Sequence, residues 1–367
     1  MLTIFKDQRV VLTLDAGGTN FVFSAYRGIS EIVEPITLPS EGDNLDNCLD
    51  NIIEGFQQVL NKLDDKPVAI SFAFPGPSDY KRGIIGDLAN LPAFRGGIAL
   101  GPMLEEIFGL PVFINNDGDL FAFGEAIAGF LPAINKELDE AGSKKMYKNM
   151  LGVTLGTGFG GGIIRNNKLY IGDNSVAGEI WVLRNRIYPE TFAEESLSIR
   201  AVLREYYKNA PEDKRENLTP KDITDIALGK AEGNQNAAVT SYKIFGKALG
   251  DALANAATLL DGMIVIGGGL SGAYNLFIDA AIQEMNNPIK TLNDSTIFRL
   301  EMEVFNIEDE LQKNKFIQGE QQEIKIPRTN KKIIYDPLKR IGIGLSKLGT
   351  SKAVAIGAYA FALTKLK

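Results

Sequence analysis

The stretch VVLTLDAGGTN (Val10–Asn20) decides the fold class of this chain, because an apolar strand runs directly into a turn of small residues. The segments LGVTLGTGFGGGII (Leu151–Ile164) and IVIGGGLSG (Ile264–Gly272) repeat this arrangement, and FINNDGD (Phe113–Asp119) places an acidic turn between the first two. Glycine turns let backbone N–H groups approach an anion closely. Three such turns predict one polyphosphate ligand bound from several sides, and hence an enzyme that uses a nucleotide.

The composition limits the classes of protein to which the chain can belong. Its 367 residues are too many for one hydrophobic core and predict two domains. The net charge of −7 argues against nucleic acid and membrane partners, which are bound through concentrated lysine and arginine. Cys48 is the only cysteine, so no intramolecular disulfide forms and we expect a cytoplasmic protein. The chain has no histidine, so proton transfer must use another side chain.

The order of strands and helices predicts an α/β protein built from two related halves. The first 130 residues follow a βββαβαβα order, in which the third strand is predicted at Glu31–Leu38 and the first helix at Leu45–Leu63. The segment around Leu151–Arg165 starts a second half in a similar way, and further helices are predicted around Thr219–Ala227, Asn236–Leu260 and Lys352–Thr364. We expect residues 1–118 plus 351–367 to form an N-terminal sugar and phosphate-loop domain. Residues 119–350 would form a nucleotide-binding domain, in which the polar, lysine-rich stretch 286–348 is read as an insertion.

Each glycine turn has a functional and a purely structural interpretation. Gly17 and Gly18 permit a tight hairpin, and Asp15 at the strand end could hold a water of Mg²⁺; the alternative is a plain hairpin with an aspartate cap. The second turn contains a GxGxxG pattern, but it leads into a strand rather than a helix, which argues against a dinucleotide fingerprint. It suits phosphate oxygens, with the Thr157 hydroxyl as an additional donor. Gly267–Gly269 could support an adenosine or simply allow close packing of a strand and a helix.

The acidic turn supplies the candidate for proton transfer. Asp117 could be an ordinary helix N-cap, but the preceding Asn115 and Asn116 provide more hydrogen-bonding groups than a cap requires. In a chain without histidine, Asp117 is the predicted catalytic base. Asn90, in a loop shaped by proline and glycine, offers the donor and acceptors that a sugar hydroxyl needs, or stabilises a turn.

Several motifs occur along this chain in a fixed order: DAGGTN, PGP with a following NLP, NND, LGTGFGGGI, AGE and LLDGMIVIGGGLS. In this order they resemble the motifs of the ROK (repressor–ORF–kinase) family of sugar kinases. That family belongs to the hexokinase–actin–Hsp70 superfamily. The resemblance covers roughly residues 9–280 and the closing GTSKAVAIGAYAFAL. It implies two ribonuclease-H-like domains around a cleft, with sugar and ATP as ligands, Mg²⁺ as cofactor and a homodimer as the assembly.

The resemblance also implies a role for individual residues. Asp117 would accept the proton of the attacking sugar hydroxyl, while the side chains that hold the sugar would be Asn90, Asn116, Glu179 and Glu194. The residues that line the nucleotide would be Gly17, Gly18, Thr19, Gly156, Thr157, Gly158, Gly267, Gly268 and Gly269, and Asp15 would help to position Mg²⁺.

Two departures from the family pattern leave a second interpretation open. Trp181 and Val182 stand where most members carry a histidine, and the family's zinc-binding cysteine cluster is missing, so zinc is not expected. The first interpretation is an ATP-dependent hexose kinase, with glucose as the family's default sugar. The alternative is a protein of the same fold that senses a sugar or nucleotide without catalysis and acts through protein partners.

Overall fold

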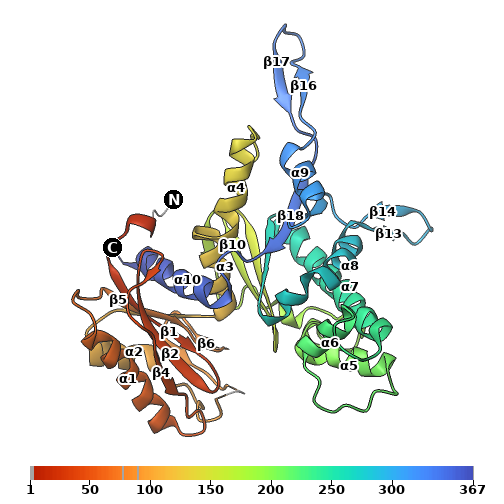
Figure 1. Cartoon of the computed structure of the whole chain (residues 1–367). Coiled ribbons are helices and arrows are strands. Elements are labelled where there is room, and N and C mark those ends of the chain that lie inside the picture. The colour runs from red at the N-terminus through yellow and green to blue at the C-terminus, as the bar shows by residue number, and fades with distance from the viewer. Residues whose placement is uncertain (1–3, 77, 89–90, 367) are drawn as a thin grey trace. The chain divides into compact units, whose positions relative to one another are not determined.

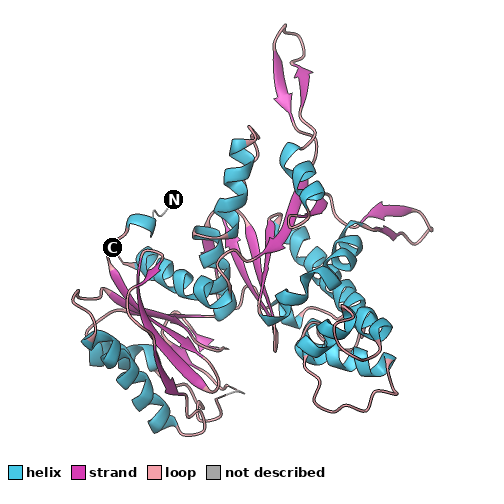
Figure 2. Ribbon diagram, in the orientation of Figure 1, coloured by secondary structure: helices cyan, strands magenta, loops and turns pink. Residues whose placement is uncertain are grey.

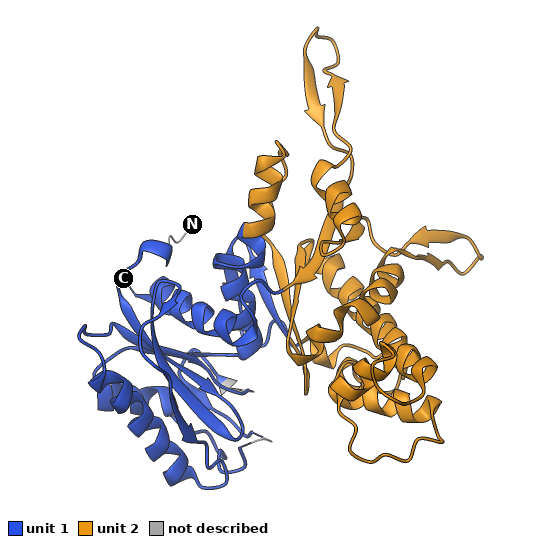
Figure 3. Ribbon diagram, in the orientation of Figure 1, with its two compact units in different colours: residues 1–132, 161–179, 346–367 blue, residues 133–160, 180–345 orange. Residues whose placement is uncertain are grey.

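The computed structural model describes residues 4–76, 78–88 and 91–366. The chain forms two compact units (Figure 3): unit 1 comprises residues 1–132, 161–179 and 346–367, and unit 2 comprises residues 133–160 and 180–345. These bounds differ from those of the two ligand-binding domains expected from the sequence, 1–118 plus 351–367 and 119–350. Which ligand each domain binds remains a prediction.

Unit 1 is built on a mixed sheet in which strands pair in the order β3-β2-β1-β5-β8, with β4 also paired to β2. The strands of this sheet are β1 (Val10–Ala16), β2 (Asn20–Arg27), β3 (Ser30–Glu31), β4 (Ile36–Pro39), β5 (Ala69–Ala73) and β8 (Val112–Asn115). β1, β5 and β8 are parallel, and β2 runs antiparallel to β1 and β4. A separate short hairpin pairs β6 (Ser78–Asp79) with β7 (Ile84–Ile85).

One face of this sheet buries the apolar side of α1 (Leu45–Asn61), together with α2 (Leu100–Phe108). Helix α1 begins where the side chain of Asn44 accepts the N–H of Asn47, and it buries residues three or four positions apart, Ile52 and Phe56 among them. The Phe56 ring packs edge-on against Phe23 of β2, with the ring centroids 5.1 Å apart. The predicted helix Leu45–Leu63 is thereby confirmed.

Two other helices, α3 (Asp117–Ile127) and α10 (Thr350–Lys365), pack closely together in unit 1. A Cβ on Gly124 would overlap the carbonyl of Ala353, and one on Gly357 would overlap the carbonyl of Leu120. The Ser71 hydroxyl on β5 donates to the carbonyl of Ala358 at 2.8 Å. Because side chains alternate along a strand, α10 covers the face of the sheet opposite to α1.

In unit 2, four parallel strands pair in the order β9 (Met150–Leu155), β12 (Met263–Gly267), β18 (Arg340–Leu345) and β15 (Glu303–Asn306). Every residue of β12 is buried, as expected of a central parallel strand. Strand β10 (Phe159–Arg165) pairs antiparallel with β11 (Lys168–Tyr170), and the division between the units falls within β10.

Helices surround this sheet (Figure 2). They are α5 (Ile199–Asn209), α6 (Pro220–Ala227), α7 (Gln235–Leu260), α8 (Tyr274–Asn286) and α9 (Glu310–Gln318), while α4 (Phe130–Glu140) begins in unit 1 and ends in unit 2. Two hairpins pair β13 (Pro288–Lys290) with β14 (Thr296–Phe298) and β16 (Gln322–Lys325) with β17 (Lys332–Tyr335). In the described ranges, no helix is both long and apolar enough to cross a membrane.

The stretch 286–348, read from the sequence as an insertion, has two structural parts. Strands β15 and β18 lie side by side in the parallel sheet of unit 2, and α9 contacts both of them. Only the two hairpins extend away from the body of this unit (Figure 1). Much of the polar, lysine-rich stretch therefore belongs to the framework of unit 2.

Candidate active site

The candidate site residues of unit 1 meet at the carboxyl ends of its three parallel strands. Asp15 on β1 lies opposite Ala73 on β5, and Ala73 lies opposite Asn115 at the end of β8. Asp117 opens α3 two residues later. The negative charge of Asp117 helps to raise the pKa of Asp15, in addition to the larger effect of desolvation. The structure thus places the predicted catalytic base and the predicted magnesium ligand in one electrostatic environment.

Asn116 and Asp117 of the acidic turn occupy different positions at the start of α3. Asn116 is the N-cap of α3, and its Oδ1 accepts the backbone N–H of Gly118 at 2.8 Å. Asp117 is the first helical residue, and its own Oδ1 accepts the same N–H at 2.8 Å. Asn116 therefore occupies the N-cap position that the structural interpretation gave to Asp117, and the two side chains share the N–H of Gly118. The Asp117 side chain is exposed, so a ligand can reach it.

Although the Asp117 side chain is accessible to a ligand, enough protein surrounds its carboxyl that desolvation is the largest influence on its pKa. The surrounding protein raises the pKa of the carboxyl, although its backbone hydrogen bonds act in the opposite direction. A carboxylate whose pKa lies above its ordinary value is a stronger base than a fully hydrated one, and a position at a helix N-terminus keeps its negative charge favourable. Both properties suit a group that must accept a proton from an alcohol.

Glycines bring β10 and the start of α3 into backbone contact. A Cβ on Gly118 would lie 2.7 Å from the carbonyl oxygen of Gly161, and one on Gly178 would lie 2.9 Å from the same oxygen. Glu179 directly follows Gly178 and is half-buried in unit 1. The structure therefore holds the predicted sugar ligand Glu179 close to the segment that carries Asp117, and its charge raises the pKa of Asp119.

Asp119 is a candidate functional residue that the sequence analysis did not identify. Its side chain is only 3% exposed, and among the described residues its Oδ1 atom has no hydrogen-bond partner. Burial raises the pKa of this carboxyl well above its usual value, and the charges of Glu179 and Asp117 raise it further. The spacing Asp117-Gly-Asp119 was the available signal, since two acids in one helical turn exceed the need of a single cap.

The first glycine turn is fixed by a serine that the sequence analysis also missed. The N–H of Gly17 donates to the carbonyl of Asn20 at 3.0 Å and closes the turn. Ser40 then donates its hydroxyl to the carbonyl of Gly18 and its N–H to the carbonyl of Thr19. These bonds fix the carbonyls of the turn, whose residues Gly17, Gly18 and Thr19 are all exposed.

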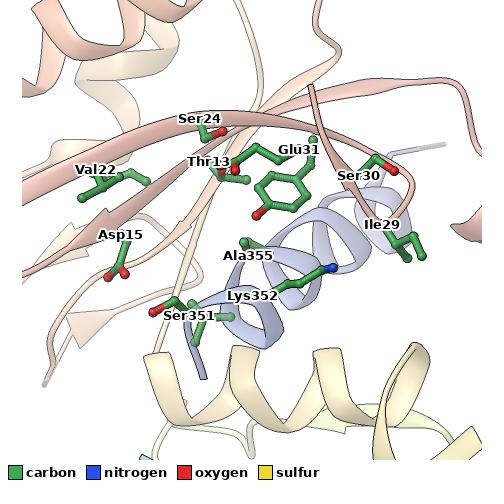
Figure 4. Close-up of a pocket in the computed structure, with 14 residues that line it drawn as sticks. Thr13, Asp15, Val22, Ser24, Ile29, Ser30, Glu31, Ser351, Lys352 and Ala355 are labelled. Atoms are coloured by element: carbon green, nitrogen blue, oxygen red, sulfur yellow. The ribbon is translucent and has the colours of Figure 1, made fainter. Parts of the chain in front are cut away.

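Asp15 also borders a cavity of about 490 Å³ in unit 1, between β1, β2 and the start of α10 (Figure 4). Hydroxyl side chains such as Thr13, Ser24 and Ser351 line part of this cavity, and Lys352 and several apolar side chains line the rest. The Ser24 hydroxyl is buried without a hydrogen-bond partner among the described residues. The space beside the Asp15 carboxylate is thus suited to water and other polar groups.

The residues of unit 1 fit Mg²⁺ held in the way that kinases hold it. In the described part of the chain, no three histidine, cysteine, aspartate or glutamate side chains form a group that could enclose a metal ion. Mg²⁺ needs no such group, because it keeps several waters and is bound through one or two carboxylates together with substrate phosphates. Asp15 and its neighbour Asp117 supply that carboxylate chemistry.

In unit 2, the second glycine turn is connected to the segment that carries Glu194. The turn joins β9 to β10, and the N–H of Gly156 donates to the carbonyl of Gly158 at 3.0 Å. Glu194 lies in a short 3₁₀ turn, Ala193–Ser196, and its Oε2 accepts the backbone N–H of Phe159 at 3.0 Å. Glu194, expected from the family to hold sugar, therefore contacts the residue that follows the second glycine turn, and its contact with a sugar remains a prediction.

The two glycine turns of unit 2 lie next to each other. Strands β9 and β12 are parallel, with Thr154 opposite Gly267. The turns that follow these two strands therefore lie at the same edge of the sheet. Gly268 has φ +87°, and a Cβ there would overlap the backbone of Leu155. A Cβ on Gly156 would lie 4.0 Å from the N–H nitrogen of Gly269. Glycine is required at Gly268 for packing, whereas Gly269 and the exposed Thr157 remain accessible.

Two further sequence predictions concern Asn90 and the pair Trp181 and Val182. Asn90 lies outside the described residues. Trp181 and Val182, which stand where the family histidine was expected, are 37% and 55% exposed in a short 3₁₀ turn of unit 2. The Trp181 ring packs edge-on against Phe192, with centroids 5.6 Å apart. Trp181 is therefore not a core tryptophan.

Comparisons with known proteins identify relatives of this chain. Residues 11–302 match the ROK family. A crystal structure of a glucokinase from Parabacteroides distasonis is 53% identical, covers 100% of both chains and superposes with a TM-score of 0.91. A glucokinase from Halalkalibacterium halodurans is 29% identical over 71% of this chain and 80% of its own length.

An N-acetyl-D-glucosamine kinase from Photobacterium profundum is 33% identical over 45% of this chain and 50% of its own length. The chain thus spans about half the length of the first curated relatives that it matches.

Proposed function

Because this chain belongs to the ROK family, we propose that it is an ATP- and Mg²⁺-dependent kinase that phosphorylates a hexose, with glucose as the preferred sugar. The accessible carboxylate of Asp117, at the start of α3 and beside Asp15, is the observation that carries the proposal. The similarity to a glucokinase over the full chain supports glucose, while the partial similarity to N-acetyl-D-glucosamine kinases makes that sugar the second candidate.

Asp117 would accept the proton of the sugar hydroxyl as that hydroxyl attacks the γ-phosphorus of ATP. A positioned general base contributes about 10²–10⁴-fold to the rate. The raised pKa of Asp117 matches this role, since it lies closer to the working pH than that of a hydrated aspartate. Asn116, Glu179 and Asn90 would orient the hydroxyl groups of the sugar, so that the reacting oxygen lies within hydrogen-bond distance of Asp117.

The glycine turns would bind the phosphates through backbone N–H groups. Gly17, Gly18 and Thr19 would contribute from unit 1, and Gly156, Thr157 and Gly158 from unit 2, with Gly267–Gly269 against the adenosine. When bound through Asp15 and the phosphates, Mg²⁺ supplies positive charge that stabilises the transferring phosphoryl group. Most of the rate enhancement would come from this charge stabilisation and from positioning.

The test is release of ADP over a panel of hexoses and N-acetylhexosamines, measured for the wild type, Asp117→Asn and Asp50→Asn. We expect sugar-dependent ADP release that falls by about 10²–10⁴-fold in Asp117→Asn. Asp50 is an exposed aspartate of α1 and provides a matched control that should retain full activity. ADP release that does not require sugar, or full activity of Asp117→Asn, would contradict the assignment.

The exposed Trp181–Val182 pair, where the family histidine was expected, favours a second candidate function. This is a sugar- or nucleotide-sensing protein that acts through protein partners without catalysis. The two functions differ in one measurement. A sensor would be stabilised against thermal unfolding by sugar but would show no turnover with any sugar of the panel, whereas the kinase shows both.

A further inference from the structure

One face of the β1–β2 hairpin carries hydroxyl side chains, whereas its other face carries the apolar core of unit 1. Phe21 and Phe23 of β2 belong to that core. Because side chains alternate along a strand, Ser24 and Tyr26 lie on the other face, and Thr13 of β1 is paired with Ser24. Ser24, Tyr26 and Thr13 are only 4%, 7% and 4% exposed. Buried hydroxyl groups of this kind need hydrogen-bond partners.

The structure leaves one of these hydroxyls without a partner. The Oγ atom of Ser24 is buried and forms no hydrogen bond with any described residue. Ser24 lines the cavity of about 490 Å³ between β1, β2 and the start of α10, called here the hairpin cavity (Figure 4). Thr13 and Tyr26 line the same cavity. A buried hydroxyl that lacks a partner beside an open space indicates that a polar molecule binds there.

The hairpin cavity extends away from the predicted phosphate turn Gly17–Thr19. Asp15 is paired with Val22 close to that turn, and Tyr26 lies four residues further along β2. At about 3.3 Å per residue, this separation corresponds to roughly 13 Å. Among the candidate site residues that the structure describes, only Asp15 lines the cavity. The cavity therefore offers space for a ligand in addition to those of the predicted sugar and nucleotide sites.

The charged groups of the hairpin cavity favour an uncharged ligand. Asp15 and Glu31 contribute two carboxyl groups, and Lys352 of α10 contributes one ammonium group. The carboxylates oppose an anion such as a sugar phosphate, while the ammonium group opposes a cation. All three groups can hydrogen-bond to the hydroxyls of a neutral molecule. Burial, and to a smaller extent the charge of Glu31, raises the pKa of Tyr26 to about 12, so its hydroxyl keeps its proton and can donate as well.

Apolar side chains line the rest of the hairpin cavity. Val22 belongs to β2, while Val354 and Ala355 belong to the first turns of α10. Such side chains pack against the C–H groups of a ligand, and the neighbouring hydroxyls bond to its oxygens. The volume of the cavity lies within the range of about 300–1,000 Å³ that is typical of small-molecule sites. A neutral monosaccharide presents both C–H and hydroxyl groups and so matches this lining.

We propose that the hairpin cavity binds a neutral monosaccharide at a second site, separate from the predicted catalytic sugar site. Ser24, Thr13 and Tyr26 would hydrogen-bond to the sugar from the sheet, and Lys352 would do so from α10. The Ser24 hydroxyl would thereby gain the partner that the rest of unit 1 does not provide. This inference goes beyond the proposed kinase activity, because binding in the cavity requires neither ATP nor a reaction.

The test is equilibrium dialysis with radiolabelled D-glucose in the absence of ATP, which counts the sugars bound per chain. We expect two glucose molecules per wild-type chain. Asp117→Ala with Glu179→Ala, which changes the predicted catalytic sugar site, should leave one. Ser24→Val should weaken binding in the cavity by roughly tenfold, as expected for the loss of one hydrogen bond. Thr364→Val, which replaces an exposed hydroxyl near the end of α10, is the matched control and should bind both sugars as the wild type does.

A second variant, Ala355→Leu, tests the site through its shape. Ala355 lies on α10, across the cavity from the hydroxyls of the strands (Figure 4). Leucine is well tolerated in helices, and its larger side chain should fill the space, so that this variant binds a single glucose. In the variant with Asp117→Ala and Glu179→Ala, unlabelled glucose 6-phosphate should not displace glucose from the cavity, because its phosphate would meet the carboxylates of Asp15 and Glu31.

Two results would overturn the proposal. The first is a single glucose per wild-type chain that Ser24→Val and Ala355→Leu bind equally well, which would mean that the cavity holds only water. The second is displacement of the cavity sugar by glucose 6-phosphate. A failure of the proposed function gives a different result, since glucose binding would then be lost in Ala355→Leu and unchanged in Asp117→Ala with Glu179→Ala. No binding of glucose at all would contradict both proposals. Circular dichroism verifies that each variant is folded.

Discussion

The carboxylate of Glu194 accepts the backbone N–H of Phe159 at 3.0 Å, across a sequence separation of 35 residues. Phe159 directly follows the turn Gly156–Gly158, and a Cβ on Gly158 would lie 2.6 Å from Oε2 of Glu194. The N–H of Ile199 also donates to the carbonyl of Gly156 at 2.9 Å. The segment after Glu194 thus holds the second glycine turn in place from one side.

Changing Glu194 should therefore affect nucleotide binding as well as any contact with sugar. We expect Glu194→Gln to raise the KM for ATP by roughly tenfold, because a hydrogen bond to a charged acceptor contributes about 1.5–3 kcal/mol and the amide retains part of it. Steady-state kinetics with ATP and sugar varied separately measure the effect. The neighbouring Glu195→Gln is the control, since Glu195 forms only partly exposed ion pairs with Arg200 and Arg204. A change confined to the KM for sugar would assign Glu194 to the sugar alone.

Gly18→Ala separates a ligand contact from a structural requirement. A Cβ at Gly18 meets nothing within 4 Å, and its backbone is not in the left-handed region, so we expect the folded protein to accept alanine. A methyl group at that position would instead displace a phosphate held against the turn. The prediction is an unchanged melting temperature with kcat/KM for ATP lowered by about 10–100-fold, or 1.4–2.8 kcal/mol of transition-state stabilisation. Gly272→Ala also meets open space and should leave both quantities unchanged. Equal activity of both variants would remove the first turn from the nucleotide site.

Asp119→Asn should stabilise the protein in the absence of ligands at neutral pH. Because burial raises the pKa of Asp119, the folded state holds this proton more tightly than the unfolded state does. The protonated Asp119 side chain therefore contributes to the free energy of unfolding. This contribution is complete below the pKa of an unfolded aspartate, about 3.9, and is lost as the pH rises through the pKa of Asp119 in the folded state. Asparagine has no charge to bury, so the variant should melt higher than the wild type at pH 7 and equally at pH 4. Each 1 kcal/mol corresponds to roughly 2–4 °C in a domain of 150–250 residues. A lower melting temperature at pH 7 would show that the protein needs the charged form.

Glu125→Ala should cost considerable stability in unit 1. The Glu125 side chain is fully buried and accepts the N–H groups of Phe130, Lys347 and Leu348 and the hydroxyl of Ser346. Removal of the carboxylate leaves these donors without their acceptor, at a cost of about 3–5 kcal/mol. Chemical denaturation with urea measures the loss. Glu54→Ala, at an exposed position of α1, is the comparison and should cost less than about 1 kcal/mol. A loss for Glu125→Ala as small as that for Glu54→Ala would contradict the structural role.

Most of the fold was predictable because its elements carry strong periodic signals. The strands before each glycine turn and the helices α1, α6, α7 and α10 lie within a few residues of their predicted bounds. The predicted strand Glu31–Leu38 is divided into β3 and β4, because Pro35 between them lacks the N–H needed for pairing. Helix α9 was missed because Phe316 is its only buried residue, so its sequence shows no apolar stripe.

The candidate site was predictable only where its residues are neighbours in sequence. Asp117 and the glycine turns could be recognised from local patterns, and the structure places Asp15 in the same electrostatic environment as Asp117. The supporting contacts connect residues far apart in the chain, such as Ser40 with Gly18. Nothing in the sequence pattern of a single serine indicates its partner. The burial that perturbs Asp119 likewise depends on β10 and on Glu179, which follow it by many residues.

The composition of unit 1 from three separate stretches of chain has a consequence for synthesis on the ribosome. Helix α10 packs on one face of the sheet, over β1, β2, β5 and β8. It also contributes the Tyr359 hydroxyl, which donates to the Asp7 carboxylate and the Arg9 carbonyl near the beginning of the chain. That helix is translated after all of unit 2. The nascent sheet of unit 1 must therefore leave this face uncovered while the more than two hundred residues between β8 and α10 are added, and during that interval it is the segment that a chaperone would protect.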